Sequence, residues 1–171
     1  MAKSRKATMP KSRIVIVNDQ DEITGHKERG TLAKEDIYRV SALWVTNLNG
    51  DILLAQRKFT KKHDPGKWGP AVAGTVDEGE TYDENIVKEA EEEIGLAGIK
   101  PALGPKRRVS EEYNYFCQWY ALTVDKSAED LTIQDEEVEQ VKWFTRNELE
   151  RELQDHPENY LDSLKWDMEN L

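Results

Sequence analysis

A helix that begins at Thr81 constrains the fold of this chain more than any other segment. Thr81 and Glu84 have the spacing of a capping box, in which each side chain accepts a hydrogen bond from the other residue's backbone N–H. An apolar stripe at helical spacing follows, formed by Ile86, Val87, Ala90 and Ile94. Gly95 then stands where such a helix ends. The stripe predicts that one face of the helix packs against another layer of structure.

Segments with the composition of strands lie before and after this helix. They are expected at 13–17, 23–28, 38–46, 52–57, 71–76, 99–109, 113–124 and 138–144. The turn residues at 47–50 predict a hairpin, and 58–68 is a basic, turn-rich loop. Two C-terminal helices are expected at 147–153 and 161–168, separated near Pro157. This order of elements favours an α/β (α+β) fold, with a mixed β-sheet sandwiched between α-helices.

The chain length of 171 residues suits one domain with a sizeable core. We expect residues 1–12 to form a flexible, basic N-terminal tail, because their cations are not followed by the apolar segment of a signal peptide. Residues 13–171 are then expected to form the single domain. No apolar run is long enough to span a bilayer, so no membrane partner is expected.

Charge and cysteine content exclude several classes of function. The net charge of −10 argues against a nucleic-acid polymer as the main partner. Cys117 is the only cysteine, so neither an intrachain disulfide nor a thiolate-rich metal site can form. Both points favour a reducing compartment, and we expect the protein in the cytoplasm. Cys117 lies on a predicted strand and is expected in the core.

Three glutamates on the expected helix indicate its chemistry. Glu89, Glu92 and Glu93 are spaced so that their carboxylates share one helix face, and only Lys88 offsets their charge locally. Like charges at this spacing destabilise an isolated helix. A solvated acidic face is one explanation. The other is a hard cation among the carboxylates, since Mg²⁺ prefers oxygen ligands and brings substrate phosphates with it. The helix alone does not decide between them.

A longer pattern around the glutamates favours the cation. Gly74 is followed after five residues by Glu80, and after seven more by Lys88-Glu89-Ala90-Glu91-Glu92-Glu93-Ile94-Gly95-Leu96. This segment, 74–96, resembles the Nudix box, the signature of the Nudix hydrolase superfamily, which includes MutT-like pyrophosphatases. Every fixed position of the box is met except two: Lys88 replaces an arginine, and Ala90 is smaller than the usual aliphatic residue.

The resemblance implies roles for individual residues. Glu89, Glu92 and Glu93, with the Gly74 carbonyl, would bind Mg²⁺, for which Mn²⁺ could substitute. Glu80 would brace the loop before the helix or reach a metal through water, and Lys88 would support the glutamates. The catalytic candidates are Glu89, Glu92 and Glu137, and either Glu89 or Glu137 would be the base. Surface charge is an equally good explanation of Glu137, which lies in an acidic run.

The same resemblance extends outside the box, over about 38–144. It implies a metal-dependent enzyme that cleaves a diphosphate linkage in a small molecule, such as a nucleoside diphosphate derivative, with a water activated by the metal. The resemblance also implies the fold of the family. A homodimer is compatible with this family membership. Arg57 and Lys67 are candidates for binding substrate phosphates. Trp68 could stack on a base, although a tryptophan packed beside the core explains it at least as well.

The chain is most similar by eye to the branch related to isopentenyl-diphosphate isomerase, through 38–41 and 160–164. Those isomerases use a cysteine and histidines just before the box, and 68–73 contains neither, which argues against isomerisation. A Nudix-fold binding module that has lost catalysis is the other alternative. Only Lys88 favours it, because lysine cannot copy the two-pronged contact of arginine. The substrate is left open among nucleoside triphosphates, dinucleoside polyphosphates, nucleotide sugars, ADP-ribose and isoprenoid diphosphates.

Overall fold

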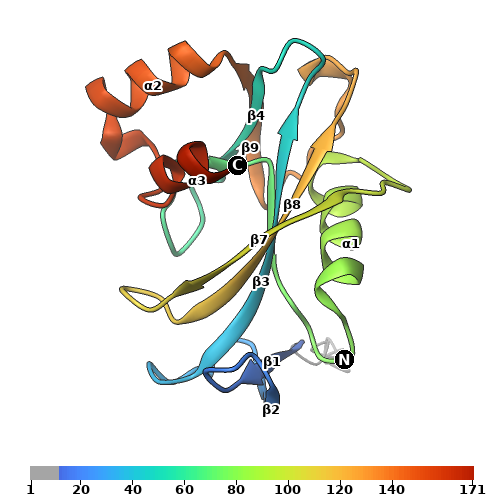
Figure 1. Cartoon of the computed structure of the whole chain (residues 1–171), viewed down its shortest axis with the longest axis vertical. Coiled ribbons are helices and arrows are strands. Elements are labelled where there is room, and N and C mark those ends of the chain that lie inside the picture. The colour runs from blue at the N-terminus through green and yellow to red at the C-terminus, as the bar shows by residue number, and fades with distance from the viewer. Residues whose placement is uncertain (1–11) are drawn as a thin grey trace, which may run out of the picture.

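The computed structural model describes residues 12–171, in which a nine-stranded mixed sheet carries helices on both faces (Figure 1). The strands are β1 (Arg13–Val17), β2 (Ile23–Glu28), β3 (Ile37–Thr46), β4 (Ile52–Arg57), β5 (Trp68–Pro70), β6 (Val72–Thr75), β7 (Ala102–Val109), β8 (Tyr115–Thr123) and β9 (Val138–Phe144). The helices are α1 (Tyr82–Ile94), α2 (Arg146–Asp155) and α3 (Leu164–Asn170), with 3₁₀ turns η1 (Ala128–Asp130) and η2 (Pro157–Asn159). The expected α/β (α+β) fold class is confirmed. Of the expected tail at 1–12, residues 1–11 lie outside the described part of the chain.

The long strand β3 organises the sheet. Along one edge it pairs in parallel with β8, from Tyr38 opposite Tyr115 to Thr46 opposite Thr123. Along the other edge it pairs in turn with β1, β6 and β4, all antiparallel. Strand β4 continues the sheet to β5 and β9. Because β6 leads directly into the segment before α1, this topology fixes the start of α1 beside the centre of the sheet.

Alternate side chains of β3 point to opposite faces of the sheet and pack into two cores, one on each face. Leu43 and Val45 are 0% exposed and lie in the cluster that α1 covers with its apolar stripe. Ala42 and Trp44 belong to the cluster on the other face, under α2 and α3. Figure 1 shows α1 and the pair α2–α3 on opposite sides of the strands. The expected sandwich is therefore present.

Helix α1 ends where the sequence predicts. Thr81 and Glu84 form both bonds of the capping box. At the other end Gly95 has φ 71°, the left-handed conformation that favours glycine, and the N–H of Leu96 donates to the Ala90 carbonyl at 3.0 Å. The stripe is buried, since Ile86, Ala90 and Ile94 are 0% exposed. A small residue at position 90 therefore lies within the packed core.

The sequence did not indicate β5, and it placed several element boundaries differently. Strand β5 (Trp68–Pro70) is only three residues long, lies at the end of the expected loop and contains a glycine and a proline. Such a strand is tolerated because β4 is the one strand that β5 pairs with in the described chain, so that Pro70 needs no second hydrogen-bonding neighbour. The expected starts of β7, β8 and α3 were two or three residues early, as is usual for boundaries.

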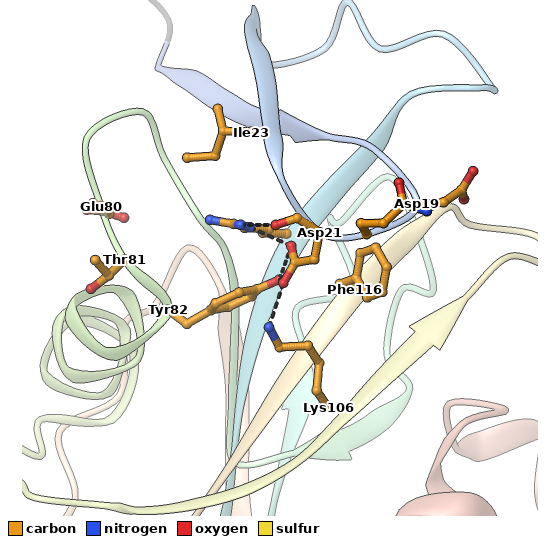
Figure 2. A pocket seen from close by; sticks show the side chains of 10 residues that line it. Asp19, Asp21, Ile23, Glu80, Thr81, Tyr82, Lys106 and Phe116 are labelled. Carbon is orange, nitrogen blue, oxygen red and sulfur yellow. Dashed lines mark hydrogen bonds and ion pairs between the residues drawn. The ribbon is translucent and has the colours of Figure 1, made fainter.

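A partly buried charge cluster joins the N-terminal hairpin to α1 and β7 (Figure 2). The Asp21 carboxylate, in the β1–β2 turn, accepts hydrogen bonds from Arg39 Nε at 2.7 Å, Lys106 Nζ at 2.5 Å and the Tyr82 hydroxyl at 3.0 Å. Burial raises the pKa of Asp21, but these donors outweigh it and hold the pKa below its usual value. The cluster lines a cavity of about 610 Å³ and connects the β1–β2 turn to β3, α1 and β7.

In residues 12–171 no helix has the length and apolar character needed to cross a membrane.

Candidate active site

One cavity of about 1060 Å³ collects most of the residues that the sequence singled out. The cavity is lined by three glutamates on α1, Glu89, Glu92 and Glu93. It is also lined by Glu137, which precedes β9. The loop between β4 and β5 forms another wall and contributes Lys61. Glu89, Glu92, Glu93 and Glu137 are therefore brought together, although Glu137 lies 44 positions after Glu93 in the sequence. Glu137 lies close enough to Glu93 for its charge to raise the pKa of that residue, and the catalytic role of Glu137 stays a prediction.

Gly74 allows the sheet to approach the helix closely. A Cβ atom at this position would lie 2.4 Å from Glu89 Cγ and 2.5 Å from Glu89 Cδ, distances that real Cβ atoms do not tolerate. Gly74 lies in β6 opposite Ser41 of β3, so its backbone cannot retreat without breaking the sheet. The glycine at the start of the box is thus explained by the space that the Glu89 side chain occupies. Gly74 also lines the cavity.

The carboxylates of Glu89 and Glu93 have an environment that favours a bound proton or cation. Burial raises the pKa of Glu93 to about 8, and the negative charges of Glu89 and Glu137 add to this effect. The Ala73 backbone N–H and the Lys61 ammonium act in the opposite direction without cancelling it. Burial also raises the pKa of Glu89, against the charge of Lys88. A cation in the cavity would relieve this crowding of negative charge.

The side chains present suit a hard divalent cation. All candidate donors are oxygen atoms, the ligands that Mg²⁺ prefers. Within residues 12–171, no three acidic, histidine or cysteine side chains already form a cage for a metal ion. Mg²⁺ rarely uses such a cage, because it keeps water ligands and is bound by one or two carboxylates together with substrate phosphates. Glu89 and Glu93, beside the Gly74 backbone, fit that pattern of binding.

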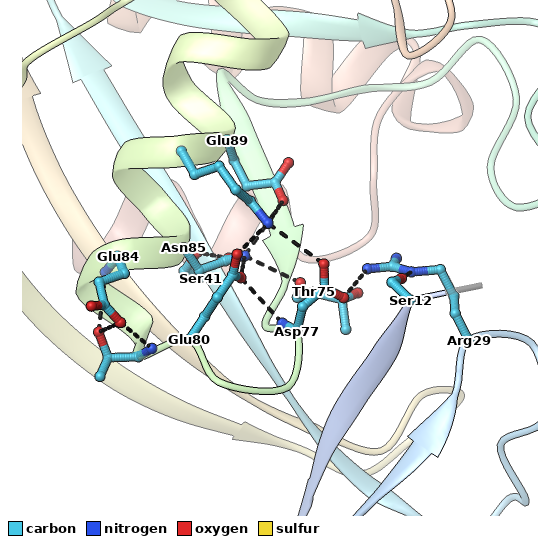
Figure 3. A network of polar contacts seen from close by, with 11 residues as sticks. Ser12, Arg29, Ser41, Thr75, Asp77, Glu80, Glu84, Asn85 and Glu89 are labelled. Atoms are coloured by element: carbon cyan, nitrogen blue, oxygen red, sulfur yellow. Dashed lines mark hydrogen bonds and ion pairs between the residues drawn. The ribbon is translucent and has the colours of Figure 1, made fainter. Parts of the chain in front are cut away.

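Glu80 joins the loop before α1 to Asn85 on the helix (Figure 3). Lys88 on the same helix adds a second contact with Glu80. Lys88 Nζ donates to Glu80 Oε1 at 2.6 Å and lies 3.5 Å from Asp77 Oδ2 and 3.6 Å from Glu89 Oε1. Glu80 Oε2 accepts from Asn85 Nδ2 at 2.9 Å and from the Asp77 backbone N–H at 3.3 Å. Glu80 therefore braces the loop, which is one of the two roles expected for it. Lys88 reaches Glu89 in the position where the family has arginine.

Two buried polar residues and one distant arginine complete this network, and sequence reasoning missed all three. Asn85 and Ser41 are both 0% exposed, and Ser41 Oγ donates to Asn85 Oδ1 at 2.5 Å. A polar residue next to the apolar stripe of α1 was a signal for Asn85, because a buried amide must find partners. From the other side, Arg29 donates to Asp77 at 3.0 Å and lines the cavity. No local pattern in the sequence could have linked Arg29 to the box.

The three substrate-binding candidates have different surroundings. Arg57 lines the cavity, but its Nε and one terminal nitrogen both donate to the His63 backbone carbonyl, at 3.1 Å and 3.0 Å. Lys67 and Trp68 are absent from the cavity lining. Lys67 pairs with Asp64 at 3.2 Å, and the Trp68 ring packs against Phe144 with centroids 5.4 Å apart. For Trp68 the core explanation is therefore favoured. The binding roles of Arg57 and Lys67 stay predictions.

Lys61 and Glu137 form an ion pair at the cavity wall, with Lys61 Nζ donating to Glu137 Oε2. Because the Lys61 charge also lowers the pKa of Glu93, the lysine acts on both carboxylates. The ion pair with Lys61 is compatible with either explanation of Glu137, as a surface charge or as the base. Cys117, by contrast, is 5% exposed in the core under α2 and α3 and does not line the cavity. The expectation of a core cysteine is confirmed.

Known proteins resemble this chain in sequence and in fold. The family model of the NUDIX domain matches residues 37–166. An uncharacterized Nudix hydrolase of Yersinia pestis is 31% identical over 136 residues, which are 78% of this chain and 73% of the relative. One from Listeria monocytogenes is 29% identical over 138 residues, covering 79% and 80% of the two chains.

Two solved structures have the same fold. A crystal structure of a Deinococcus radiodurans protein has a TM-score of 0.80 and 23% identity, covering 92% of this chain and 97% of the other. A MutT NUDIX hydrolase from Burkholderia pseudomallei has a TM-score of 0.65 at 20% identity, covering 80% and 99%. At these identities the structures support the fold alone, whereas the domain match covers most of the chain. None of these findings favours the isomerase-related branch over the rest of the superfamily. The chain belongs to the Nudix hydrolase family.

Proposed function

We propose that this Nudix protein hydrolyses a diphosphate linkage in a nucleoside diphosphate derivative or a related small molecule. Mg²⁺, or Mn²⁺ in its place, would be held by Glu89, Glu92 and Glu93 with the Gly74 carbonyl. One observation carries the proposal: the α1 carboxylates and Glu137 line a single cavity in which the pKa of Glu93 is raised to about 8. Buried carboxylates crowded in this way are stabilised when a cation joins them.

Different residues of this chain have different roles in such a reaction. When bound, the metal neutralises the diphosphate and lowers the pKa of a water so that it can attack phosphorus. Either Glu89 or Glu137 accepts the proton of the water, since both carboxylates line the cavity and each lies beside a lysine. Glu80 and Lys88 hold the loop and Glu89 in place. No covalent intermediate with the protein is required.

The two alternatives have less support. An isomerase would need an acid beside the box, and the one cysteine is buried in the opposite core. Isopentenyl diphosphate with Mg²⁺ should therefore yield no allylic isomer. A binding module without catalysis is disfavoured because the box glutamates are all present and Lys88 already contacts Glu80 and lies near Glu89.

A Mg²⁺-dependent hydrolysis screen, in which substrate and products are separated by anion-exchange chromatography, tests the proposal. Its probes are nucleoside triphosphates, dinucleoside polyphosphates, nucleotide sugars, ADP-ribose and isoprenoid diphosphates. We expect turnover of at least one class, and we expect Glu93→Gln to lower that turnover by about two orders of magnitude or more, because it removes a metal-binding charge.

The matched control is Glu91→Gln, which removes an exposed carboxylate from the same helix outside the cavity lining. It should keep wild-type turnover. If Glu92→Gln and Glu93→Gln both behave like Glu91→Gln, the metal assignment is wrong.

For the whole protein we propose the cytoplasm and a small-molecule partner, because the single cysteine is buried and the net charge is −10. A homodimer is compatible with the family, and sedimentation velocity measures it directly.

A further inference from the structure

One lysine reaches the carboxylate end of the active-site cavity. Lys61, in the loop between β4 and β5, donates from its Nζ to Glu137 Oε2, and both residues line the cavity. Both side chains are partly sheltered from water, since that of Lys61 is 27% exposed and that of Glu137 38%. Within residues 12–171 no other hydrogen bond or ion pair engages either side chain. The ammonium and the carboxylate therefore neutralise each other inside the proposed metal-binding cavity.

The backbone of Glu137 is held independently of this ion pair. Its carbonyl accepts from the Lys58 N–H at 3.0 Å, and its own N–H donates to the Gln134 carbonyl at 3.1 Å. The Gln134 N–H donates in turn to the carbonyl of Glu93 on α1 at 2.9 Å. These three bonds fix the backbone of Glu137 relative to α1. Only the side chains of Lys61 and Glu137 have to move for the ion pair to break.

Lys58 attaches the same loop at a second point. Its Nζ lies 3.0 Å from Asp135 Oδ1 and 3.3 Å from Glu139 Oε2. Lys58 is absent from the cavity lining, whereas Lys61 belongs to it. The start of the loop can thus stay attached beside β9 while the Lys61 side chain leaves its partner.

The charge of Lys61 also acts on the helix glutamates. Burial, and then the charges of Glu89 and Glu137, raise the pKa of Glu93, and the Lys61 ammonium acts against this rise. Lys61 therefore supplies part of the positive charge that this end of the cavity requires. A divalent cation among the same carboxylates would supply that charge in its place, and the two cations would repel each other at close range.

We propose that Lys61 is the resident counter-ion of Glu137 in the metal-free protein and competes with the divalent cation that the α1 glutamates bind. Cation binding then favours the state in which Lys61 has left, because that state lacks the repulsion. The departure of Lys61 also frees a Glu137 oxygen whose lone pair the ammonium engages. Lys61 is a positioning residue, since it acts through Glu137. This inference rests on the metal site of the proposed function and adds an exchange of cations that precedes catalysis.

Calorimetric titration with Mn²⁺ in the absence of substrate tests the competition. Lys61→Met keeps an aliphatic side chain but removes the charge, so it should bind Mn²⁺ about fivefold or more tightly than wild type. Lys61→Arg, which keeps a cation, should bind Mn²⁺ no more tightly than wild type. The titrations are repeated in the Glu93→Gln background, where weaker binding identifies the heat as coming from this site and not from other surface carboxylates.

The matched control is Lys62→Met. Lys62 also lines the cavity, but it is exposed and has no ion pair in the part of the chain that the structure describes. At about 0.15 M salt the charge of an exposed lysine is largely screened. Mn²⁺ affinity should therefore stay within about twofold of wild type.

A double-mutant cycle shows whether Lys61 acts through Glu137. In a Glu137→Gln background the ion pair is already absent, and the lysine is free to extend into water. Lys61→Met should then change Mn²⁺ affinity by less than about twofold. A fivefold gain that persists in this background would show that Lys61 acts by its charge alone, and its role as the counter-ion of Glu137 would be overturned.

Melting temperatures give a readout that does not depend on turnover. With a chelator present, Lys61→Met should melt about 1–3 °C below wild type, because Glu137 loses its partner. With saturating Mn²⁺ this difference should vanish or reverse, since the cation replaces the lysine. A purely structural ion pair would lower the melting temperature equally under both conditions, and that result would contradict the proposal.

The titrations separate this inference from the proposed function. Equal Mn²⁺ affinity of wild type and Lys61→Met would overturn the competition and leave the metal site intact. Binding to Lys61→Met alone would support the competition and show that the lysine prevails in the wild type. Binding to neither protein would contradict the metal site of the proposed function, and the competition with it.

Discussion

Glu93 connects metal binding to the stability of the protein. Its pKa rises from the usual 4.5 of a glutamate to about 8 in the folded chain, chiefly through burial. A carboxyl group with a raised folded-state pKa binds its proton more tightly in the native state than in the unfolded state. Its contribution to stability is therefore largest below pH 4.5 and is lost as the pH rises towards 8. A cation that pairs with the ionised form should remove this loss.

Thermal unfolding in the presence of a chelator checks this expectation. Between about pH 5 and pH 8 the wild type should lose roughly a few kcal/mol of stability from this group, an upper limit because the side chain is only half-buried. Glu93→Gln should show a flatter pH dependence and melt no lower than wild type at the upper end of this range. Mg²⁺ should raise the melting temperature of the wild type more than that of the variant. An identical pH slope for both proteins would contradict the buried-carboxylate account.

Among the elements, α1 depends on the loop that precedes it. Lys88 takes the place of the family's arginine and connects Glu80, Asp77 and Glu89. Lys88→Ala should lower kcat by about tenfold or more, because Glu89 loses the neighbour that positions it. Lys88→Arg should keep or raise kcat, since a guanidinium can bond to two carboxylates at once. Unchanged turnover in Lys88→Ala would show that packing alone positions the helix carboxylates.

Local signals explain why so much of this architecture is predictable from sequence. The capping box of Thr81 and the left-handed Gly95 act within a few residues, so both ends of α1 follow from local chemistry. The shared face of Glu89, Glu92 and Glu93 follows from helical geometry alone. In contrast, β5 depends on contacts distant in sequence, because Trp68–Pro70 pairs with the edge of β4 and Trp68 bridges to Tyr160. The contact of Arg107 with Trp166 joins residues from β7 and α3, and no local pattern encodes it.

At the scale of the whole molecule, one sheet separates two cores, and only the core under α1 supports the proposed metal ligands. Ile86 on α1 and Leu164 on α3 are both 0% exposed, one on each face. Ile86→Ala and Leu164→Ala should each cost about 2–5 kcal/mol of stability, because each leaves a cavity in packed surroundings. Only Ile86→Ala should weaken Mn²⁺ binding, measured by calorimetry, since only α1 carries the proposed ligands. Equal loss of metal affinity in both variants would show that the two faces are not independent.

The burial of Cys117 has a practical consequence. It is the only thiol in the sequence, and its pKa is raised by burial in the core beneath α2 and α3. A thiol reagent in solution can therefore react only when that layer opens, and the labelling rate counts those openings under native conditions. The rate at which Cys117 of the wild-type chain is labelled therefore measures local opening of the layer formed by α2 and α3. Replacement of Cys117 by alanine or valine would give a thiol-free background on which one new cysteine can carry a probe anywhere on the surface.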